Sequence, residues 1–386
     1  MKLANFDPAA FKRDNWQQQP RVFRQVLPNF KDLLSADELA GIALELGVDS
    51  RIVQNNHGTW NLVHGPFDAY DTLGDSHWTL LVQAVNEHYP PTRPLLRAFR
   101  WLPAWRIDDL MISYATPQGG VGPHIDQYDV FIIQGEGSRR WRVGPKGNYQ
   151  TRLPHPDLSQ IEKFEAIIDE ELNAGDMIYI PAGFPHEGTA ISASLSYSVG
   201  FRAPSQAEWL SALADHALEH ELLGKRYRDN NATLLAQEQL TPDDLPVEAI
   251  QAVQEHLINA LQDESLVREV VAKLLSTNPR PPLQFWPENT VQQDELTRIL
   301  ELSNAWIAAP GLRWLFSHDE TQDYVYVQGN RFRSDEHVRA LLTQFSKEDE
   351  VHSRVIQNAM KRSADVRSIY LWLYNEGFVV EVDEES

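Results

Sequence analysis

The sequence predicts an α+β chain in three parts: a jelly-roll (cupin, or double-stranded β-helix) domain over residues 1–204, a helical dimerisation segment over 205–264 and a C-terminal winged-helix domain over 265–386. Three patterns support this prediction. Short apolar strands alternate with turn residues between Asp109 and Phe201, as in jelly rolls. Helical periodicity follows over 205–262, and the remainder combines helices with a hairpin-like stretch.

The composition describes an acidic globular protein. The chain has 386 residues, 42% of them hydrophobic, and a formal net charge of −21, which disfavours phosphate-backbone binding and suits a basic partner. Because cysteine is absent, disulfides and thiolate metal sites are excluded. Neither a secretory h-region nor an apolar run of membrane-helix length is visible. We therefore expect a soluble, cytoplasmic protein with no membrane partner.

Residues before the main strands predict one short strand and two helices. The strand is RVFRQVLPNF (21–30). Ser35 and Glu38 form a capping box ahead of an apolar-periodic stretch, so a helix is expected to start there. A second helix is expected over Ser76–Tyr89, ended by the two prolines at 90 and 91.

The strand region has a regular order. In GSRRWRVG, strand alternation places Arg139, Trp141 and Val143 on one face and Arg140 and Arg142 on the other. The predicted strands are DDLMISYA (108–115), YDVFIIQG (128–135), GSRRWRVG (137–144), MIYIP (177–181) and SLSYSVGFR (194–202), with PQGGVGP (117–123) as a Gly-rich loop.

The last two parts predict contacts with other proteins. The amphipathic helices of 205–262 favour a homodimer contact, with a helical layer packed on its own domain as the alternative. Winged helices often bind DNA. From Arg280 onward, however, 11 Lys and Arg stand against 18 Asp and Glu, a net charge of −7. We therefore expect a protein-contact module and no direct nucleic-acid binding.

A metal site is predicted from three residues. His124 and Asp126 form an H-x-D pair at the start of an apolar strand, and His186 follows a second strand that ends in Ile-Pro-Ala-Gly. Neighbouring jelly-roll strands can bring these residues together. Two imidazoles and one carboxylate on one face of a metal leave coordination positions open, which suits non-haem Fe(II). The alternative is that each histidine is an ordinary satisfied polar residue, as most of the 13 in this chain must be.

The two motif stretches also carry a resemblance. GPHIDQYDVFIIQGEGSRRWRVG (122–144) and AGDMIYIPAGFPHEG (174–188) resemble the JmjC-type 2-oxoglutarate oxygenases. More closely, they are similar to the bacterial ribosomal oxygenases, which hydroxylate an arginine side chain in a large-subunit ribosomal protein, the one numbered sixteen. The similarity covers essentially the whole chain. It implies that His124, Asp126 and His186 are the catalytic iron ligands.

The resemblance also implies a binding site for 2-oxoglutarate. By spacing and face, Arg139 is the basic residue that holds its distal carboxylate, a position where many relatives have lysine. The alternative is a surface arginine like its neighbours. Ser113 and Ser194 are candidate hydroxyl donors to the same co-substrate, and both could equally be ordinary strand serines.

The implied reaction uses Fe(II), 2-oxoglutarate and O₂, gives succinate and CO₂, and hydroxylates a substrate carbon. The implied partners are the ribosomal protein and a second copy of the chain. Asp129 and Glu136, near the metal strand, are candidate contacts for an arginine guanidinium, and both also fit solvent-exposed turn acids.

Three alternative functions stay open at this point. The first is the same chemistry on another basic protein, as a hydroxylase or as an N-methyl demethylase. The second is a metal-binding cupin without oxygenase activity, although such sites usually combine several histidines with a glutamate and have no evident use for Arg139. The third is a winged-helix regulator with a sensory jelly roll, which the acidic C-terminal part disfavours.

Overall fold

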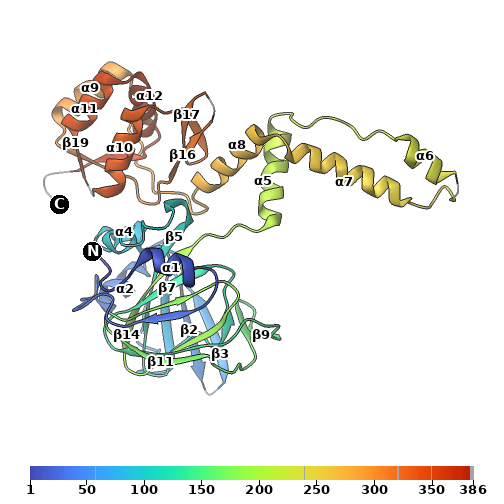
Figure 1. The fold of residues 1–386 in the computed structure, drawn as a ribbon. Coiled ribbons are helices and arrows are strands. Elements are labelled where there is room, and N and C mark those ends of the chain that lie inside the picture. The colour runs from blue at the N-terminus through green and yellow to red at the C-terminus, as the bar shows by residue number, and fades with distance from the viewer. Residues whose placement is uncertain (57, 239, 320, 349, 383–386) are drawn as a thin grey trace. The chain divides into compact units, whose positions relative to one another are not determined.

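The chain forms two compact units, Met1–Ala203 and Pro204–Ser386. The computed structural model describes residues 1–56, 58–238, 240–319, 321–348 and 350–382. Figure 1 shows the first unit as a body of strands and the second as mainly helices. None of the helices within the described residues has the length and hydropathy that a membrane span requires.

Two antiparallel sheets build the first unit, as the jelly-roll prediction requires. The eight-stranded sheet has the order β1-β12-β7-β14-β5-β4-β2-β3 and the four-stranded sheet the order β11-β8-β13-β6. Apolar side chains of β7 and β12 from the first sheet pack against those of β8 and β11 from the second. The strands are β1 (Arg21–Phe23), β2 (Ser50–Asn56), β3 (Thr59–His64), β4 (Trp78–Val82), β5 (Ile107–Ala115), β6 (His124–Ile125), β7 (Asp129–Gln134), β8 (Ser138–Val143), β11 (Ile168–Asn173), β12 (Met177–Ile180), β13 (Pro185–Ala190) and β14 (Ser194–Phe201), with β9 (Thr151–His155) and β10 (Leu158–Ile161) as a separate hairpin.

Short helices pack on the eight-stranded sheet through a second cluster of buried residues. They are α1 (Pro8–Asp14), α2 (Ala36–Ile42), α3 (Val85–His88) and α4 (Arg93–Arg97), with 3₁₀ turns at Pro90–Thr92 and Ala104–Arg106. The predicted capping box is present: the Ser35 hydroxyl accepts from the Glu38 amide, and the Glu38 carboxylate accepts from the Ser35 amide. The helix start predicted at Ser35 is confirmed.

The helix predicted over Ser76–Tyr89 is wrong for most of its length. Residues 78–82 form β4, which pairs with both β2 and β5, and only 85–88 are α-helical. The segment WTLLV is apolar except for Thr79 and is buried from Thr79 to Val82, so its pattern does not distinguish a buried strand from a helix. Pairing with two neighbouring strands decides in favour of the sheet.

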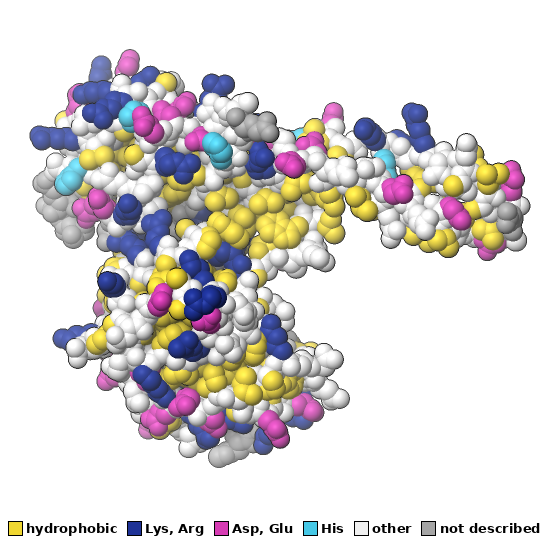
Figure 2. Space-filling view, viewed as in Figure 1, with side chains coloured by type: hydrophobic (Ala, Val, Ile, Leu, Met, Phe, Trp, Pro, Cys, Tyr) yellow, Lys and Arg dark blue, Asp and Glu magenta, His cyan; other side chains and the backbone are white. Residues whose placement is uncertain are grey.

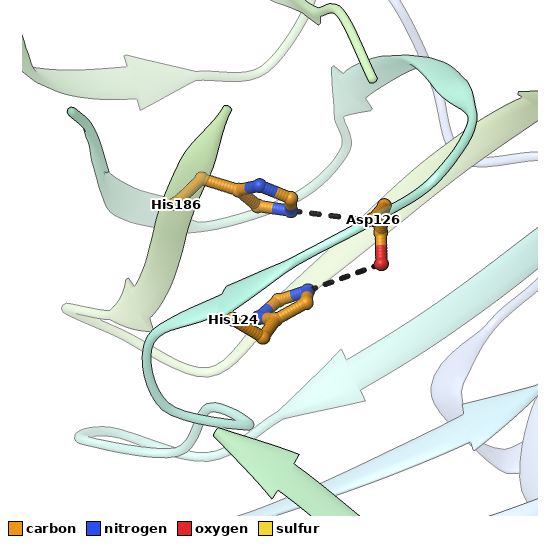
Figure 3. Close-up of side chains that lie close together, drawn as sticks. All are labelled: His124, Asp126 and His186. Carbon is orange, nitrogen blue, oxygen red and sulfur yellow. Dashed lines mark ion pairs between the residues drawn. The ribbon is translucent and has the colours of Figure 1, made fainter. Parts of the chain in front are cut away.

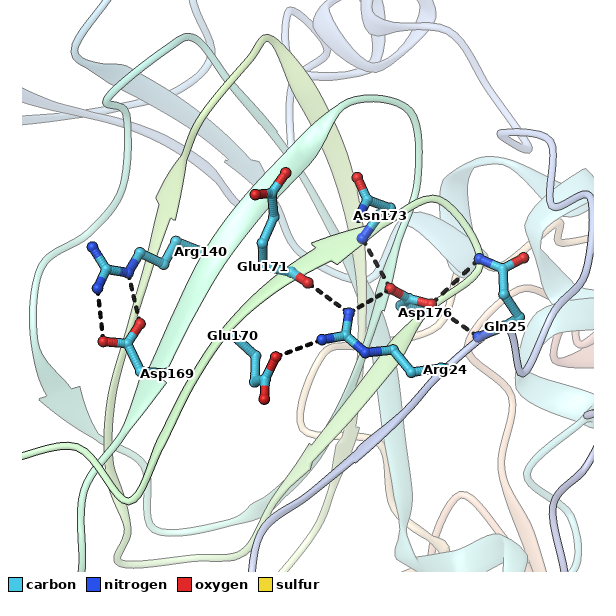
Figure 4. A network of polar contacts seen from close by, with 8 residues as sticks. All are labelled: Arg24, Gln25, Arg140, Asp169, Glu170, Glu171, Asn173 and Asp176. Atoms are coloured by element: carbon cyan, nitrogen blue, oxygen red, sulfur yellow. Dashed lines mark hydrogen bonds and ion pairs between the residues drawn. The ribbon is translucent and has the colours of Figure 1, made fainter.

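A polar network ties the N-terminal segment to the β11–β12 turn (Figure 4). The Asp176 carboxylate accepts from the backbone amides of Gln25 and Asn173, at 2.8 and 3.1 Å, and from the Arg24 guanidinium at 2.8 Å. Burial raises the pKa of Asp176, but these three donors outweigh it and hold the pKa below its ordinary value. The strand predicted within 21–30 forms only as β1, at residues 21–23.

Asp129 is neither an exposed turn acid nor a free substrate contact. Its side chain is fully buried and accepts from the Tyr179 hydroxyl at 2.6 Å, from Gln17 Nε2 at 3.1 Å and from Arg106 Nη2 at 3.0 Å. Both predicted roles are therefore wrong: Asp129, the first residue of β7, is buried, and its carboxylate already has three partners within the protein. Glu136 is exposed at the turn after β7, as one interpretation proposed.

The second unit begins with α5 (Gln206–Glu219), α6 (Asn231–Gln237), α7 (Val247–Leu261) and α8 (Glu264–Ser276). Residues 220–230 between α5 and α6 are not helical, and the Asn230 side chain caps α6 by accepting from the Thr233 amide. A further buried cluster holds together α9 (Gln293–Leu302), α10 (Glu336–Lys347), α11 (Ser353–Arg362) and α12 (Ala364–Asn375). Two three-stranded sheets complete the unit: β19 (Val351–His352), β15 (Ala305–Ala308) and β20 (Val379–Glu381) form one, and β16 (Trp314–His318), β17 (Asp323–Val327) and β18 (Asn330–Arg333) form the other.

Candidate metal centre and co-substrate pocket

The three predicted metal ligands lie together in the first unit (Figure 3). His124 on β6 pairs directly with His186 on β13, and their ring centroids are 4.2 Å apart. Asp126 follows β6, with one carboxylate oxygen 3.9 Å from His124 Nε2 and the other 3.6 Å from His186 Nε2. The geometry therefore places two imidazole nitrogens and a carboxylate around one point.

The position of the H-x-D pair differs from the prediction. His124 does not begin the apolar strand: β6 belongs to the four-stranded sheet, whereas the apolar strand β7 belongs to the eight-stranded sheet. Residues 126–128 connect the two strands. This crossing turns the Asp126 carboxylate toward the paired histidines of the smaller sheet (Figure 3).

Backbone carbonyls orient both imidazoles. His124 Nδ1 lies 2.9 Å from the Gly122 carbonyl oxygen, and His186 Nδ1 lies 3.0 Å from that of Phe184. Since a carbonyl only accepts, Nδ1 of each ring carries the proton, and the lone pair of Nε2 is left toward Asp126. Burial, assisted by the His124 ring, lowers the pKa of His186 to about 4. The ring is therefore neutral at pH 7, the form in which histidine binds a metal.

Arg139 is buried between the two sheets, where it connects β8 to two strands of the larger sheet. Its Nε donates to Ser194 Oγ and its Nη1 to Ser113 Oγ, both at 2.9 Å. Nη2 donates to the backbone carbonyls of the same two serines, also at 2.9 Å. The three side chains named from the sequence thus lie in contact with one another. The surface alternative for Arg139 is wrong, because only 6% of the residue is exposed.

The charge of Arg139 is not neutralised within the described residues, because its hydrogen-bond partners there are hydroxyls and carbonyls. Burial lowers its pKa to about 9, which still leaves the guanidinium protonated at neutral pH. A buried cation of this kind is costly unless an anion joins it. Because each serine hydroxyl accepts from Arg139, its own O–H remains to be donated. Arg139, Ser113 and Ser194 therefore present donors suited to a carboxylate.

Gly188 is a site residue that the sequence reasoning did not single out. It lies opposite Trp141 in the β13–β8 pairing, and a Cβ at Gly188 would lie 2.7 Å from two ring carbons of that tryptophan. The indole therefore needs glycine at this position. The available signal was a glycine two residues after His186, on the same face of a strand.

A second group of possible ligands lies on α5 and at its C-terminal end, formed by His216, Glu219 and His220. The Lys273 ammonium lies 3.3 Å from His216 Nδ1. This positive charge opposes a metal ion at the same place. The group of His124, Asp126 and His186, whose ligand atoms lie within 4.8 Å of one another, is the better metal centre.

Comparisons with known proteins agree with this geometry. The JmjC domain family matches residues 94–209, and the ROXA-like winged helix family matches residues 259–379. The chain is 45% identical over 324 residues to the ribosomal protein uL16 3-hydroxylase of Escherichia coli K12, covering 84% of this chain and 85% of that protein.

The chain belongs to the ribosomal oxygenase family.

Further ribosomal oxygenases extend the comparison. A probable ribosomal oxygenase of Haemophilus influenzae is 30% identical over 317 residues, 78% of this chain and 76% of that protein. The X-ray structure of E. coli YcfD matches with a TM-score of 0.87 and 39% identity, covering 99% of this chain and 100% of that one. The YcfD structure in complex with cobalt and 2-oxoglutarate matches with a TM-score of 0.84 and 39% identity over 99% of both chains. The family resemblance and the fold class predicted from the sequence are confirmed.

Proposed function

We propose that the chain is a 2-oxoglutarate- and Fe(II)-dependent oxygenase that hydroxylates an arginine side chain of large-subunit ribosomal protein uL16. The observation that carries the proposal is a paired-histidine and aspartate group in the same inter-sheet region as a buried arginine whose hydrogen-bond partners are hydroxyls and carbonyls. The E. coli relative, named as a uL16 3-hydroxylase, supports the substrate.

We assign His124, Asp126 and His186 as the iron ligands. The donor set fits Fe(II), because two imidazole nitrogens and one carboxylate form a facial group that leaves positions open. When bound, the iron and 2-oxoglutarate supply an oxidation by O₂ that yields succinate and CO₂ and places one oxygen on a substrate carbon. The protein's own part is to hold the ligand atoms ready: the Gly122 and Phe184 carbonyls fix both rings with Nε2 free for the metal.

We assign Arg139, Ser113 and Ser194 to the distal carboxylate of 2-oxoglutarate. The two hydroxyls and the guanidinium come from three strands of two sheets, so the packing of the two sheets fixes their relative positions. A carboxylate there would neutralise the buried charge with charge-assisted hydrogen bonds. Since the site lies between the sheets, the same packing excludes water from the co-substrate.

We further propose that residues 205–264 form a homodimer contact. Apolar side chains spaced along one face of α7 are exposed, and Figure 2 shows hydrophobic side chains at the surface around α6 and α7. The exposed residues of α7 are Val247, Ile250, Val253, Leu257, Ile258 and Leu261. A second copy of the chain would bury this stripe. We place the enzyme in the cytoplasm, where ribosomal proteins are made, with no direct contact to nucleic acid because of its net charge of −21.

Mass spectrometry of ribosomal proteins tests the function. Purified uL16 is incubated with the enzyme, Fe(II), 2-oxoglutarate and O₂. A co-substrate-dependent gain of one oxygen on a single arginine is the expected result. Succinate without that gain would keep the oxygenase and reject uL16, and formaldehyde release from a methylated peptide would identify a demethylase. Metal binding with none of these products would reject the oxygenase.

A further inference from the structure

The Trp141 indole N–H has no hydrogen-bond partner among the described residues. Trp141 is only 7% exposed, and its Nε1 atom is inaccessible to solvent. The indole nitrogen can only donate a hydrogen bond, so it needs an acceptor from another group. Buried donors without an acceptor are rare in folded proteins, and each calls for a specific explanation.

The register of the two strands places Trp141 between the metal centre and Arg139. In the β13–β8 pairing, His186 faces Val143, Gly188 faces Trp141 and Ala190 faces Arg139. Residues two apart on a strand share a face, so the side chains at 139, 141 and 143 all point to the same side of β8. The Trp141 ring centroid is 6.3 Å from that of His186. Along β8, Trp141 therefore lies between the candidate metal centre and Arg139.

The hydrogen-bond partner of Trp141 follows from the proposed function, on which the present inference rests. If 2-oxoglutarate binds the metal with one end and Arg139 with the other, it must pass beside Trp141. We propose that the Trp141 indole N–H donates a hydrogen bond to a carboxylate oxygen of 2-oxoglutarate, which makes Trp141 a third kind of co-substrate-binding residue. The protein substrate is a poorer partner, because Trp141 lies in the buried cluster between the sheets.

Gly188 supports this assignment independently. A Cβ at this position would lie 2.7 Å from two carbons of the indole ring and would displace it, whereas glycine leaves room for the ring beside β13. The indole thus requires a glycine within a strand, which weakens the strand. A smaller apolar residue at position 141 would fill the core without requiring that glycine and without burying an N–H that has no acceptor.

Trp141→Phe tests the proposal, since it keeps an aromatic ring and removes the N–H. Trp101→Phe is the matched control: its indole nitrogen is also buried without a partner among the described residues, but it packs against Phe6, Phe11 and Phe131 in the other core. Calorimetric titration of the Co²⁺-loaded proteins with 2-oxoglutarate should show about tenfold weaker binding for Trp141→Phe, the size of one hydrogen bond to a charged group. Binding to the control, and Co²⁺ binding to both variants, should be unchanged.

Nuclear magnetic resonance supplies a second measurement on the wild-type chain. Of its 11 tryptophan indole signals, the one absent from the Trp141→Phe spectrum should move downfield when 2-oxoglutarate is added to the Zn²⁺-loaded protein. Equal 2-oxoglutarate affinity in wild type and Trp141→Phe, or an unmoved signal, would overturn the proposal. If Arg139→Ala weakens binding while Trp141→Phe does not, only this inference fails. If the metal-loaded wild type does not bind 2-oxoglutarate, the proposed function fails with it.

Discussion

Replacing Arg139 by alanine should separate co-substrate binding from metal binding. The substitution removes the guanidinium that donates to Ser113 and Ser194 and, in the proposed complex, to the distal carboxylate. A charge-assisted hydrogen bond of this kind contributes on the order of 2–3 kcal/mol. Since about 1.4 kcal/mol corresponds to a factor of ten, the 2-oxoglutarate requirement should rise roughly 30- to 150-fold.

The assay is succinate formation as a function of 2-oxoglutarate concentration, with the Fe(II) requirement measured in parallel. Arg140→Ala is the matched control: its guanidinium lies on the opposite face of β8, exposed and paired with Asp169. It should leave both requirements unchanged. An unchanged 2-oxoglutarate requirement in Arg139→Ala would refute the assignment, and an equal loss of iron and co-substrate binding would indicate general disruption of the pocket.

Other substitutions test the site and the fold. His124→Ala and Asp126→Ala should each abolish turnover, and iron-dependent activity in both variants would contradict the ligand assignment. Asp129→Ala should lower the free energy of unfolding by about 1–3 kcal/mol in urea titrations, because it leaves the buried Tyr179 hydroxyl without its acceptor and the partly buried Arg106 without its ion-pair partner. Gly188→Ala should cost about 1–3 kcal/mol in the same measurement, since its Cβ overlaps the facing indole ring. Asp176→Asn should destabilise the protein at pH 7 and less at pH 3: the pKa of Asp176 is held below its ordinary value, so its stabilisation is present above about pH 4 and lost as the pH falls through the lowered value.

Local chemistry explains why the sequence alone singles out His124, Asp126 and His186, which the structure brings together. An H-x-D pair next to an apolar strand, with a later histidine after a second strand, specifies donor types that few structural roles require together. Strand alternation likewise placed Arg139 and Arg140 on opposite faces, and the structure buries the first and exposes the second. Both inferences depend only on neighbouring residues.

Long-range pairing explains the errors. WTLLV at 78–82 is apolar except for Thr79 and does not alternate, so only its two partner strands show that it is not a helix. Asp129 follows the metal motif closely and therefore resembled a site residue. Its actual partners are Gln17, Arg106 and Tyr179. They are distant in sequence, and no local pattern predicts these contacts.

The kinds of donor atoms, the alternation of the strands and the family could be predicted from the amino-acid sequence, because these depend on residue identity and short spacing. The three-dimensional pairing of the strands sets which sheet carries each candidate ligand and which polar groups are left without partners among the described residues. His124 meets His186 because β6 pairs with β13, and Trp141 lies between the metal centre and Arg139 because β8 pairs with the same strand in one register. Register depends on contacts between residues far apart in the chain, and a shift by one position would turn every one of these side chains to the other face.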